Sequence, residues 1–161
     1  MKATAVVSIA ITFFLFCHQA WSANSTAKFY TLNYDAPPGS HFVSLAGTMV
    51  IPELPRAGIY YLWPGLQIPG NKGVYQNVLD GRSGSWWIAS GYCCSQPSLG
   101  WGDGFGVSAG QMVKFNNVKH PSAWKSTLKR DKPEKTVSNE FALCKCFLDV
   151  FLPDQFLLLY S

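Results

Sequence analysis

The feature that most constrains the fold of this chain is the regular interruption of its apolar runs. From Phe29 onward, short runs of β-branched and aromatic residues are broken by Gly, Pro, Asn or Asp at intervals of roughly 8 to 12 residues. The three- to four-residue periodicity of an amphipathic helix is not found in this part of the sequence. We therefore expect an all-β fold of short antiparallel strands. The expected strands are 41–51, 58–63, 73–79, 85–90, 111–118 and 136–143.

Breakers and composition set the ends of these segments. Pro64-Gly65 is expected to end the strand 58–63, since proline lacks the amide hydrogen that a sheet needs. Ser95–Gly110 contains one proline and five glycines and is expected to be a loop. The tail Phe147–Tyr160 is nearly all apolar and is expected to supply one or two final core strands.

One hairpin is predicted with particular clarity. Asp80-Gly81 is a turn dipeptide, so Val74–Leu79 and Ser85–Ser90 should form its two arms. Because side chains alternate along a strand, Trp86 and Trp87 should point to opposite faces, one toward the core and the other outward. The same alternation separates Gln76 from its immediate neighbours. A Gln among valines is either a satisfied core group or a hydrogen-bond donor placed in a pocket.

The N-terminus has the pattern of a cleavable secretory signal peptide. Lys2 precedes an apolar run from Ala3 to Cys17, and Ala20 and Ser22 have the spacing that a signal peptidase recognises. We expect residues 1–22 to be the signal, cleavage to follow Ser22, and residues 23–161 to form a single secreted β-sandwich domain. The apolar run is shorter than the roughly 20 residues that span a bilayer, so stable membrane insertion is not expected.

Export brings two covalent modifications into consideration. Asn24-Ser25-Thr26 is an N-glycosylation sequon just beyond the expected cleavage point. After removal of the signal, four cysteines remain, in two close pairs. Neighbouring cysteines bond to each other only through a strained ring, so we expect disulfides between the two pairs. The disulfide candidates are Cys93, Cys94, Cys144 and Cys146.

Composition narrows the class of ligand. The chain is 48% hydrophobic, 15% aromatic and 14% charged, so it can bury a core and still place rings on a surface. The formal charge of +4 is concentrated in Lys114–Lys135. We expect this segment to be a solvated hairpin and loop, and the alternative is a contact for phosphate or an acidic polymer. Nothing in the sequence resembles a nucleic-acid-binding module, so no nucleic-acid partner is expected. The oligomeric state is left open.

The stretch Gly47–Val118 resembles a group of exported fungal proteins with a concanavalin-like β-sandwich, a jelly roll also used by the glutamic peptidases, or eqolisins. The resemblance covers roughly half of the mature chain and implies an antiparallel β-sandwich that is incomplete or divergent toward the C-terminus. The segments that carry it are Thr48–Pro52, Tyr60–Gln67, Val74–Gly81, Trp86-Trp87 and Gly110-Gln111.

The resemblance also implies a candidate catalytic residue. In glutamic peptidases a Glu acts as general base and a Gln amide stabilises the developing oxyanion. Gln76 matches the strand that bears the Gln. No Glu follows at the matching later strand, because Glu140 comes too early in the pattern and the tail offers only Asp149 and Asp154.

Three functions are compatible with these observations. The first is binding of a glycan or an apolar small molecule on an aromatic-lined concave face. A second is catalysis of a pericyclic closure of the hetero-Diels-Alder type in fungal natural-product biosynthesis, which needs only an aromatic pocket and one or two hydrogen-bond donors. The third is hydrolysis centred on Gln76, of the glutamic-peptidase type. The expected ligand-binding residues are Tyr61, Trp63, Gln76, Trp86 and Trp87.

Other chemistries have weaker support in the sequence. Once the signal leaves, His41 and His120 are the remaining histidines, too few for a three-histidine metal site. The Gly-x-Ser-x-Gly motif of serine hydrolases is missing, and no spacing selects a pair of carboxylates for glycoside hydrolysis. Neither a metal nor a cofactor is expected.

Overall fold

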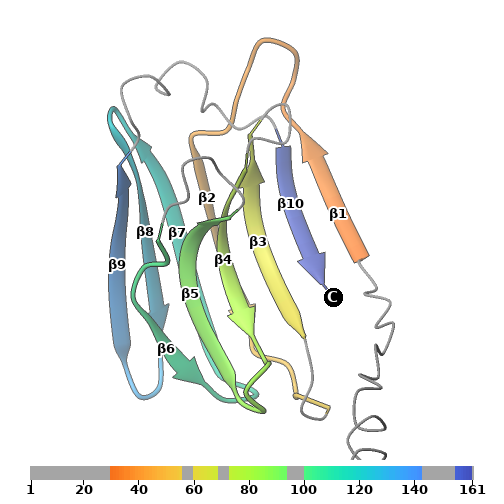
Figure 1. Ribbon diagram of the computed structural model, residues 1–161, viewed down its shortest axis with the longest axis vertical. Coiled ribbons are helices and arrows are strands. Elements are labelled where there is room, and N and C mark those ends of the chain that lie inside the picture. Colours follow the sequence, from red (N-terminus) through yellow and green to blue (C-terminus); the bar gives the residue numbers. More distant parts are fainter. Residues whose placement is uncertain (1–29, 56–59, 69–72, 94–99, 143–154, 161) are drawn as a thin grey trace, which may run out of the picture.

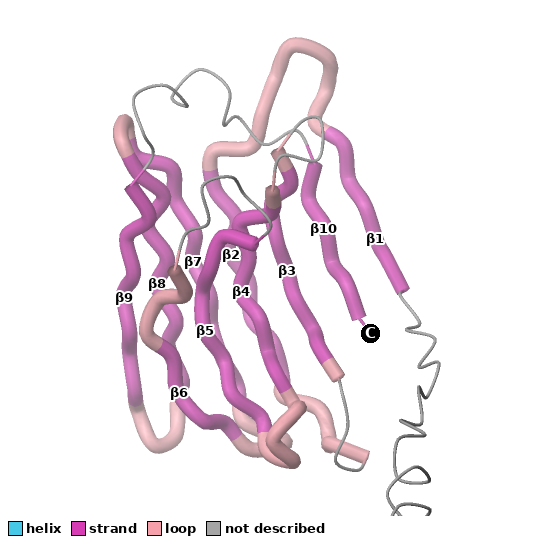
Figure 2. The backbone as a smooth tube through the Cα atoms, viewed as in Figure 1, coloured by secondary structure: helices cyan, strands magenta, loops and turns pink. Residues whose placement is uncertain are grey.

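The chain folds into two antiparallel sheets that pack face to face (Figure 1). The computed structural model describes residues 30–55, 60–68, 73–93, 100–142 and 155–160, the last range by its backbone alone. These residues form ten strands and no helix, as Figure 2 shows, so none of them belongs to a helix that could cross a bilayer. The expected all-β sandwich is therefore confirmed.

The two sheets differ in width. Sheet A has the strand order β1-β10-β3-β4-β5-β6, and sheet B has the order β2-β7-β8-β9. Sheet A consists of β1 (Tyr30–Asp35), β10 (Gln155–Tyr160), β3 (Tyr61–Gln67), β4 (Val74–Asp80), β5 (Trp86–Cys93) and β6 (Gly104–Val107). Sheet B consists of β2 (Ser44–Val50), β7 (Met112–His120), β8 (Ala123–Arg130) and β9 (Lys135–Ala142). The last described strand, β10, thus lies between the first strand and β3.

The predicted hairpin is present as β4 and β5. Its register pairs Asp80 with Trp87, so the turn lies at Asp80-Gly81 as expected. The main-chain N–H of Arg82 donates to Oδ1 of Asp80 at 2.9 Å, which stabilises the turn. Gly84 completes the loop with a φ of 81°, a conformation that favours glycine.

The expected end of the strand at Pro64-Gly65 was wrong. β3 continues through both residues to Gln67. It pairs with β10 along this stretch, whereas its pairing with β4 is interrupted between Leu62 and Gly65. The missing amide hydrogen of Pro64 therefore interrupts one ladder and leaves the strand intact.

The segment expected to be a loop, Ser95–Gly110, contains β6. Phe105 and Val107 of this strand are buried in the core. One of the glycines that suggested a loop, Gly104, has a packing role instead, because a Cβ there would lie 2.5 Å from Cζ2 of Trp87 and closer still to the main-chain oxygen of Ile88. Glycine here makes room for an indole ring.

The basic segment Lys114–Lys135 forms the β7–β8 hairpin and the start of β9. Lys125 and Lys129 of β8 are exposed and alternate with the buried residues Trp124 and Leu128. Lys129 also forms an ion pair with Glu134 at 2.6 Å, which lowers the pKa of that exposed carboxyl. The exposed positions of these lysines agree with the prediction of a solvated hairpin, and the apolar residues that alternate with them belong to the core.

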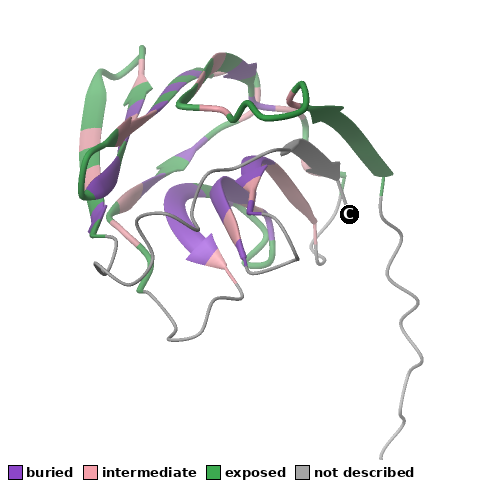
Figure 3. Ribbon diagram, turned by 90° about the horizontal axis from the view of Figure 1, so that it is seen from above, coloured by how far each residue is buried: buried purple, intermediate pink, exposed green. Residues whose placement is uncertain are grey.

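Side chains from both sheets fill the space between them in two clusters. The first contains Met49, Ile51, Leu79, Trp86, Ile88, Phe105, Val107, Val113, Phe115 and Leu128. The second contains Leu66, Ile68, Tyr75, Tyr92, Trp124 and Phe141. Figure 3 shows that burial is densest on the middle strands of sheet A, whereas β1 is exposed along its whole length.

A buried polar network lies between the two apolar clusters. Nδ2 of Asn77 lies 2.8 Å from Oγ of Ser90, 3.0 Å from Oγ of Ser126 and 3.3 Å from Oδ1 of Asn117. Asn117 in turn donates to Oδ1 of Asn77 at 2.6 Å. All four residues are completely buried, with 0% relative exposure. They join β4 and β5 of sheet A to β7 and β8 of sheet B. Their polar atoms supply one another's hydrogen bonds, which is what deep burial requires.

Several expectations fall outside the described residues. These are the signal peptide 1–22, the sequon at Asn24, and the cysteines Cys94, Cys144 and Cys146. Cys93, at the end of β5, is disulfide-bonded. The identity of its partner stays a prediction.

Candidate functional site on the outer face of sheet A

The residues of β4 alternate between two faces of sheet A. Asn77 bonds to side chains of sheet B, and the ring of Tyr75 lies 5.2 Å from that of Trp124, so both point into the sandwich. We call this side the inner face. Residues one position away point to the opposite side, which we call the outer face. The outer-face residues of β4 are Val74, Gln76, Val78 and Asp80.

The register of the neighbouring strands extends the outer face across sheet A. Residues directly opposite each other in a sheet share a face, so the outer face can be followed in rows. The row nearest the β4–β5 turn consists of Tyr61, Asp80, Trp87 and Gly106. The next row consists of Val78, Ala89 and Gly104, and Trp63 lies on the same face of β3, two residues from Tyr61. The third consists of Gly65, Gln76 and Gly91.

Gln76 is the central feature of this face. Its side chain is only 1% exposed, yet its Nε2 makes no hydrogen bond to any described residue. A buried amide without a partner costs about 1–3 kcal/mol, so such groups are rare in native proteins. The residues beside it in the sheet, Gly65 and Gly91, carry no side chains, so nothing on the adjacent strands can reach its amide from the row itself. Gln76 is thus a hydrogen-bonding group that the described fold leaves unused.

Trp101 covers the position beside Gln76. A Cβ on Gly91 would collide with its indole ring, so the ring packs directly on the main chain of β5. The segment is fixed by Gly102, whose N–H donates to the carbonyl of Ser90 at 2.9 Å, and by Asp103, whose N–H donates to Oδ1 of Asn139 at 2.7 Å. Trp101 nevertheless remains 53% exposed. Sequence reasoning did not select it, although a Trp within a glycine-rich stretch was the available signal.

Two rings of β3 lie on the outer face on the other side of Gln76 from Trp101, and we call this pair the aromatic border. Tyr61 and Trp63 lie two residues apart on the same face, with ring centroids separated by 6.2 Å and planes inclined by 27°. Nε1 of Trp63 is buried and makes no hydrogen bond to a described residue. The outer face therefore holds two unpartnered buried donors, the indole of Trp63 and the amide of Gln76.

Trp86 and Trp87 point in opposite directions, as the alternation along β5 requires. Trp87 is 39% exposed and lies on the outer face, in the row of Tyr61. Trp86 is in the core, where its Nε1 donates to the carbonyl of Pro52 at 2.8 Å. The structure thus brings Tyr61, Trp63, Gln76 and Trp87 to one surface and places Trp86 on the other side of the sheet.

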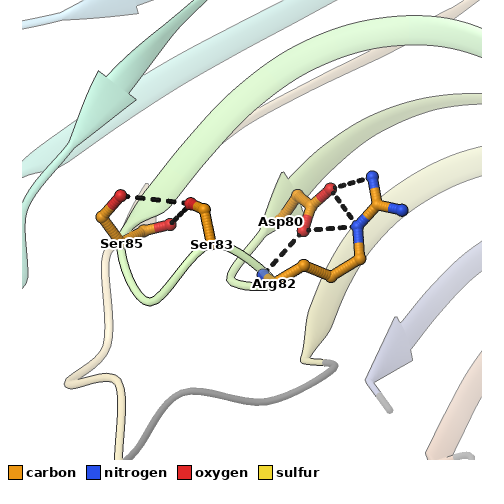
Figure 4. A network of polar contacts seen from close by, with 4 residues as sticks. All are labelled: Asp80, Arg82, Ser83 and Ser85. Carbon is orange, nitrogen blue, oxygen red and sulfur yellow. Dashed lines mark hydrogen bonds and ion pairs between the residues drawn. The ribbon is translucent and has the colours of Figure 1, made fainter.

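A charged pair stands at the turn end of the same face. Nε of Arg82 lies 2.9 Å and Nη2 lies 2.7 Å from Oδ2 of Asp80 (Figure 4). The guanidinium also lies over the ring of Tyr61, with 5.5 Å between Cζ and the ring centroid. The hydrogen bonds and charge of Asp80, with a smaller contribution from Tyr61, raise the pKa of Arg82. The cation is held in one place beside the aromatic border.

Carboxylates that could act with Gln76 are few on this sheet. The described strands of sheet A contain two, Asp35 on the outermost strand β1 and Asp80, which is bound by Arg82. Glu140 lies on β9 of sheet B, opposite Lys125, and is exposed. Gln76 is therefore placed as a hydrogen-bond donor, and the described strands place no general base beside it.

The inner face carries groups with shifted pKa values. Burial raises the pKa of Tyr75, and burial likewise raises the pKa of Tyr92. Both rings belong to the core cluster beside Trp124, so these shifts concern stability. Within the described ranges, no group of three or more His, Cys, Asp or Glu side chains is arranged to hold a metal ion.

Comparison with known proteins adds information about the fold. Neither a protein-family profile nor a curated protein matches the sequence. Among solved structures, the chain is similar to Scytalido-glutamic peptidase with a peptide-based transition state analog, with a TM-score of 0.62, 14% identity, and coverage of 83% of this chain and 63% of that chain. A second structure of this peptidase, with a transition state analog inhibitor, has a TM-score of 0.62 and 13% identity, and the match covers 81% of this chain and 63% of that chain.

A third solved structure belongs to the same group. It is SCP-B, a member of the eqolisin family of peptidases, in a complex with the tripeptide Ala-Ile-His, with a TM-score of 0.59, 12% identity, and coverage of 83% of this chain and 62% of that chain. The chain therefore spans less than two thirds of the length of these structures. The expected distant similarity to glutamic peptidases is confirmed at the level of the fold.

Proposed function

We propose that this chain is an exported binding protein whose ligand is an extended peptide held on the outer face of sheet A. One observation carries the proposal: Gln76 is 1% exposed, and its Nε2 has no hydrogen-bond partner among the described residues. A peptide carbonyl accepts hydrogen bonds from an amide, so a bound main chain would satisfy this donor. The indole N–H of Trp63 supplies a second donor on the same face.

The shape of the face agrees with an extended ligand. Gly91 leaves room for the Trp101 ring to pack beside Gln76, and Trp63 lies on the same face of the neighbouring strand β3. Aromatic borders of this kind bury apolar side chains, and a few polar groups between them fix the orientation. The structures to which this fold is similar hold a peptide-based analog and the tripeptide Ala-Ile-His, which supports a peptide as the first ligand to test.

Binding can be measured through the exposed indoles. The probe is a hexapeptide of Ala, Ile and Ser, acetylated and amidated so that it carries no terminal charge. We expect saturable quenching of Trp fluorescence, and a Gln76→Met variant should bind at least about fivefold more weakly, because one hydrogen bond contributes about 1 kcal/mol. Gln111→Met is the matched control, since Gln111 lies outside this face, where its side chain bonds to Ser108 and Lys132. Saturable binding that is equal in both variants and the parent would overturn the role of Gln76.

A glycan is the second candidate, favoured by the ring pair Tyr61 and Trp63. The two rings stack on each other with planes inclined by 27°, and together they supply apolar surface of the kind against which a sugar ring packs. Parallel titrations with cell-wall oligosaccharides decide between the candidates. Quenching by oligosaccharides alone, lost in Trp63→Ala, would replace the peptide with a glycan.

Hydrolysis can be tested in the same samples. The proposal assigns to Gln76 a hydrogen bond and assigns no residue to water activation, because Asp80 is occupied by Arg82. We expect the hexapeptide to be recovered intact after incubation at acid pH. Cleavage that disappears in Gln76→Met would convert the binding site into an active site.

A further inference from the structure

The charged pair beside the proposed peptide site has a feature that the turn does not require. Asp80 already stabilises the turn by accepting the main-chain N–H of Arg82 at 2.9 Å. The guanidinium adds a side-on contact through Nε and Nη2 to the same carboxylate. This contact uses one edge of the guanidinium, and Figure 4 shows that Nη1 points away from Asp80.

The position of the guanidinium relative to the face is also fixed. Cζ lies 5.5 Å from the centroid of the Tyr61 ring, and Tyr61 stacks on Trp63. The Arg82 side chain is 62% exposed, whereas that of Asp80 is 15% exposed. The free end of the guanidinium is therefore open to solvent at the end of the aromatic border, held from beneath by Asp80 and Tyr61.

From these contacts we infer that Arg82 is a specificity-determining residue that binds a carboxylate of the peptide. The inference rests on the proposed function of the outer face. A guanidinium presents two parallel N–H groups to a carboxylate, and its orientation here is already set, so little side-chain freedom is lost on binding. A carboxylate at the free end would lie closer to the guanidinium than to Asp80, so attraction exceeds repulsion.

Spacing along β4 sets the position of that carboxylate in the ligand. Asp80 lies four residues from Gln76, a separation of about 14 Å at the usual strand rise. An extended peptide has the same rise for each residue. The carboxylate that reaches Arg82 should therefore lie about four residues from the carbonyl that accepts from Gln76. Two sources have this chemistry, the C-terminal carboxylate of a short peptide and the side chain of Asp or Glu.

The experiment compares three acetylated hexapeptides in the full chain. The first is amidated and uncharged, the second has a free C-terminus, and the third is amidated but has Glu as its last residue. We expect one or both of the charged peptides to bind about fivefold more tightly than the uncharged one, as a solvent-exposed bidentate ion pair of about 1 kcal/mol predicts. The peptide that shows the gain identifies the source of the carboxylate.

Variants of Arg82 test the assignment. In Arg82→Gln the charged and uncharged peptides should bind with equal affinity, while Arg82→Lys should retain only part of the preference, because Lys lacks the planar fork. Lys125→Gln is the matched control, because it removes an exposed positive charge from sheet B, away from this face. Its preference should equal that of the parent.

The outcomes separate this inference from the function on which it rests. A preference that persists in Arg82→Gln, or equal binding of all three peptides by the parent, would overturn the role of Arg82 and leave peptide binding standing. An equal loss of preference in Lys125→Gln would assign the effect to overall charge and would also overturn it. Binding of none of the three would overturn both.

Discussion

Gln76 and Asn77 are adjacent residues of β4 whose side-chain amides differ in their hydrogen bonding. Both are buried, at 1% and 0% exposure, and they point to opposite faces of sheet A. Asn77 has partners from two sheets, whereas Nε2 of Gln76 has none among the described residues. A buried amide with partners holds the sandwich together, and one without partners costs stability in the unliganded protein. The difference indicates that the inner face serves the fold and that the outer face serves a ligand.

The largest effect is expected from breaking the inner network. Asn77→Leu keeps the approximate size of the side chain but leaves the amide of Asn117 without its 2.6 Å acceptor. We expect the free energy of unfolding to fall by about 3 kcal/mol, because several buried polar atoms lose partners together. Chemical denaturation followed by circular dichroism measures this loss. A change below about 1 kcal/mol would show that the network adds little to stability.

The next effect concerns the contact between Trp101 and β5. Gly91→Ala places a methyl group where the indole ring packs, so the ring must move away from Gln76. We expect stability to fall by about 1–2 kcal/mol and the affinity for the hexapeptide to fall as well. Gly100→Ala is the control, since a Cβ at that position meets nothing within 4 Å. Equal affinity in Gly91→Ala and the parent would remove Trp101 from the site.

A gain in stability is expected at Gln76. Gln76→Met retains the length of the side chain and removes an amide whose Nε2 is unpartnered, so unfolding should require about 1 kcal/mol more. The same denaturation measurement checks this value. The free energy of unfolding is thus expected to rise in Gln76→Met and to fall in Asn77→Leu. This opposite sign at neighbouring residues is the sharpest form of the comparison. A destabilised Gln76→Met would mean that the amide supports the fold.

The smallest effect near neutral pH is expected at Tyr75. Burial raises its pKa above the ordinary value of about 10, so the protonated form is favoured by folding. The stability that this shift provides is present below pH 10 and is lost as the pH rises further, by up to about 1.4 kcal/mol per pH unit for each such tyrosine. Tyr75→Phe should lose stability less steeply above pH 10, with Tyr92 responsible for the remainder. Identical alkaline profiles would contradict this assignment.

The parts of this account that depend on alternation could be predicted from the sequence. The turn at Asp80-Gly81 predicted the β4–β5 hairpin, and alternation predicted that one of Trp86 and Trp87 faces the core. The structure places Trp86 there and Trp87 on the face of Gln76. The strand passing through Pro64 and the strand β6 were not predicted, because the breaker residues there have local roles. In a sequence, a proline that only interrupts the pairing with one neighbouring strand, or a glycine that leaves space for a ring, looks the same as a residue that ends a strand.

The residues of the candidate site that lie on strands could be predicted, and those that depend on tertiary contacts could not. Tyr61, Trp63, Gln76 and Trp87 are strand residues, so their face follows from counting positions. Trp101 reaches the site from a connection whose course depends on hydrogen bonds to Ser90 and Asn139, which are distant in sequence. The position of Arg82 over Tyr61 likewise requires two strands to be in register. Contacts of this kind follow from tertiary structure and leave no local pattern.

The most direct test is to observe the two amides in the same titration. In protein labelled with ¹⁵N, the side-chain NH₂ signals of Gln76 and Asn77 are followed while the uncharged hexapeptide is added. Our account predicts that the Gln76 signals shift saturably, with the same Kd as the fluorescence quenching, and that those of Asn77 stay in place. Saturable fluorescence quenching with unchanged Gln76 signals would contradict the claim that this amide is reserved for a ligand.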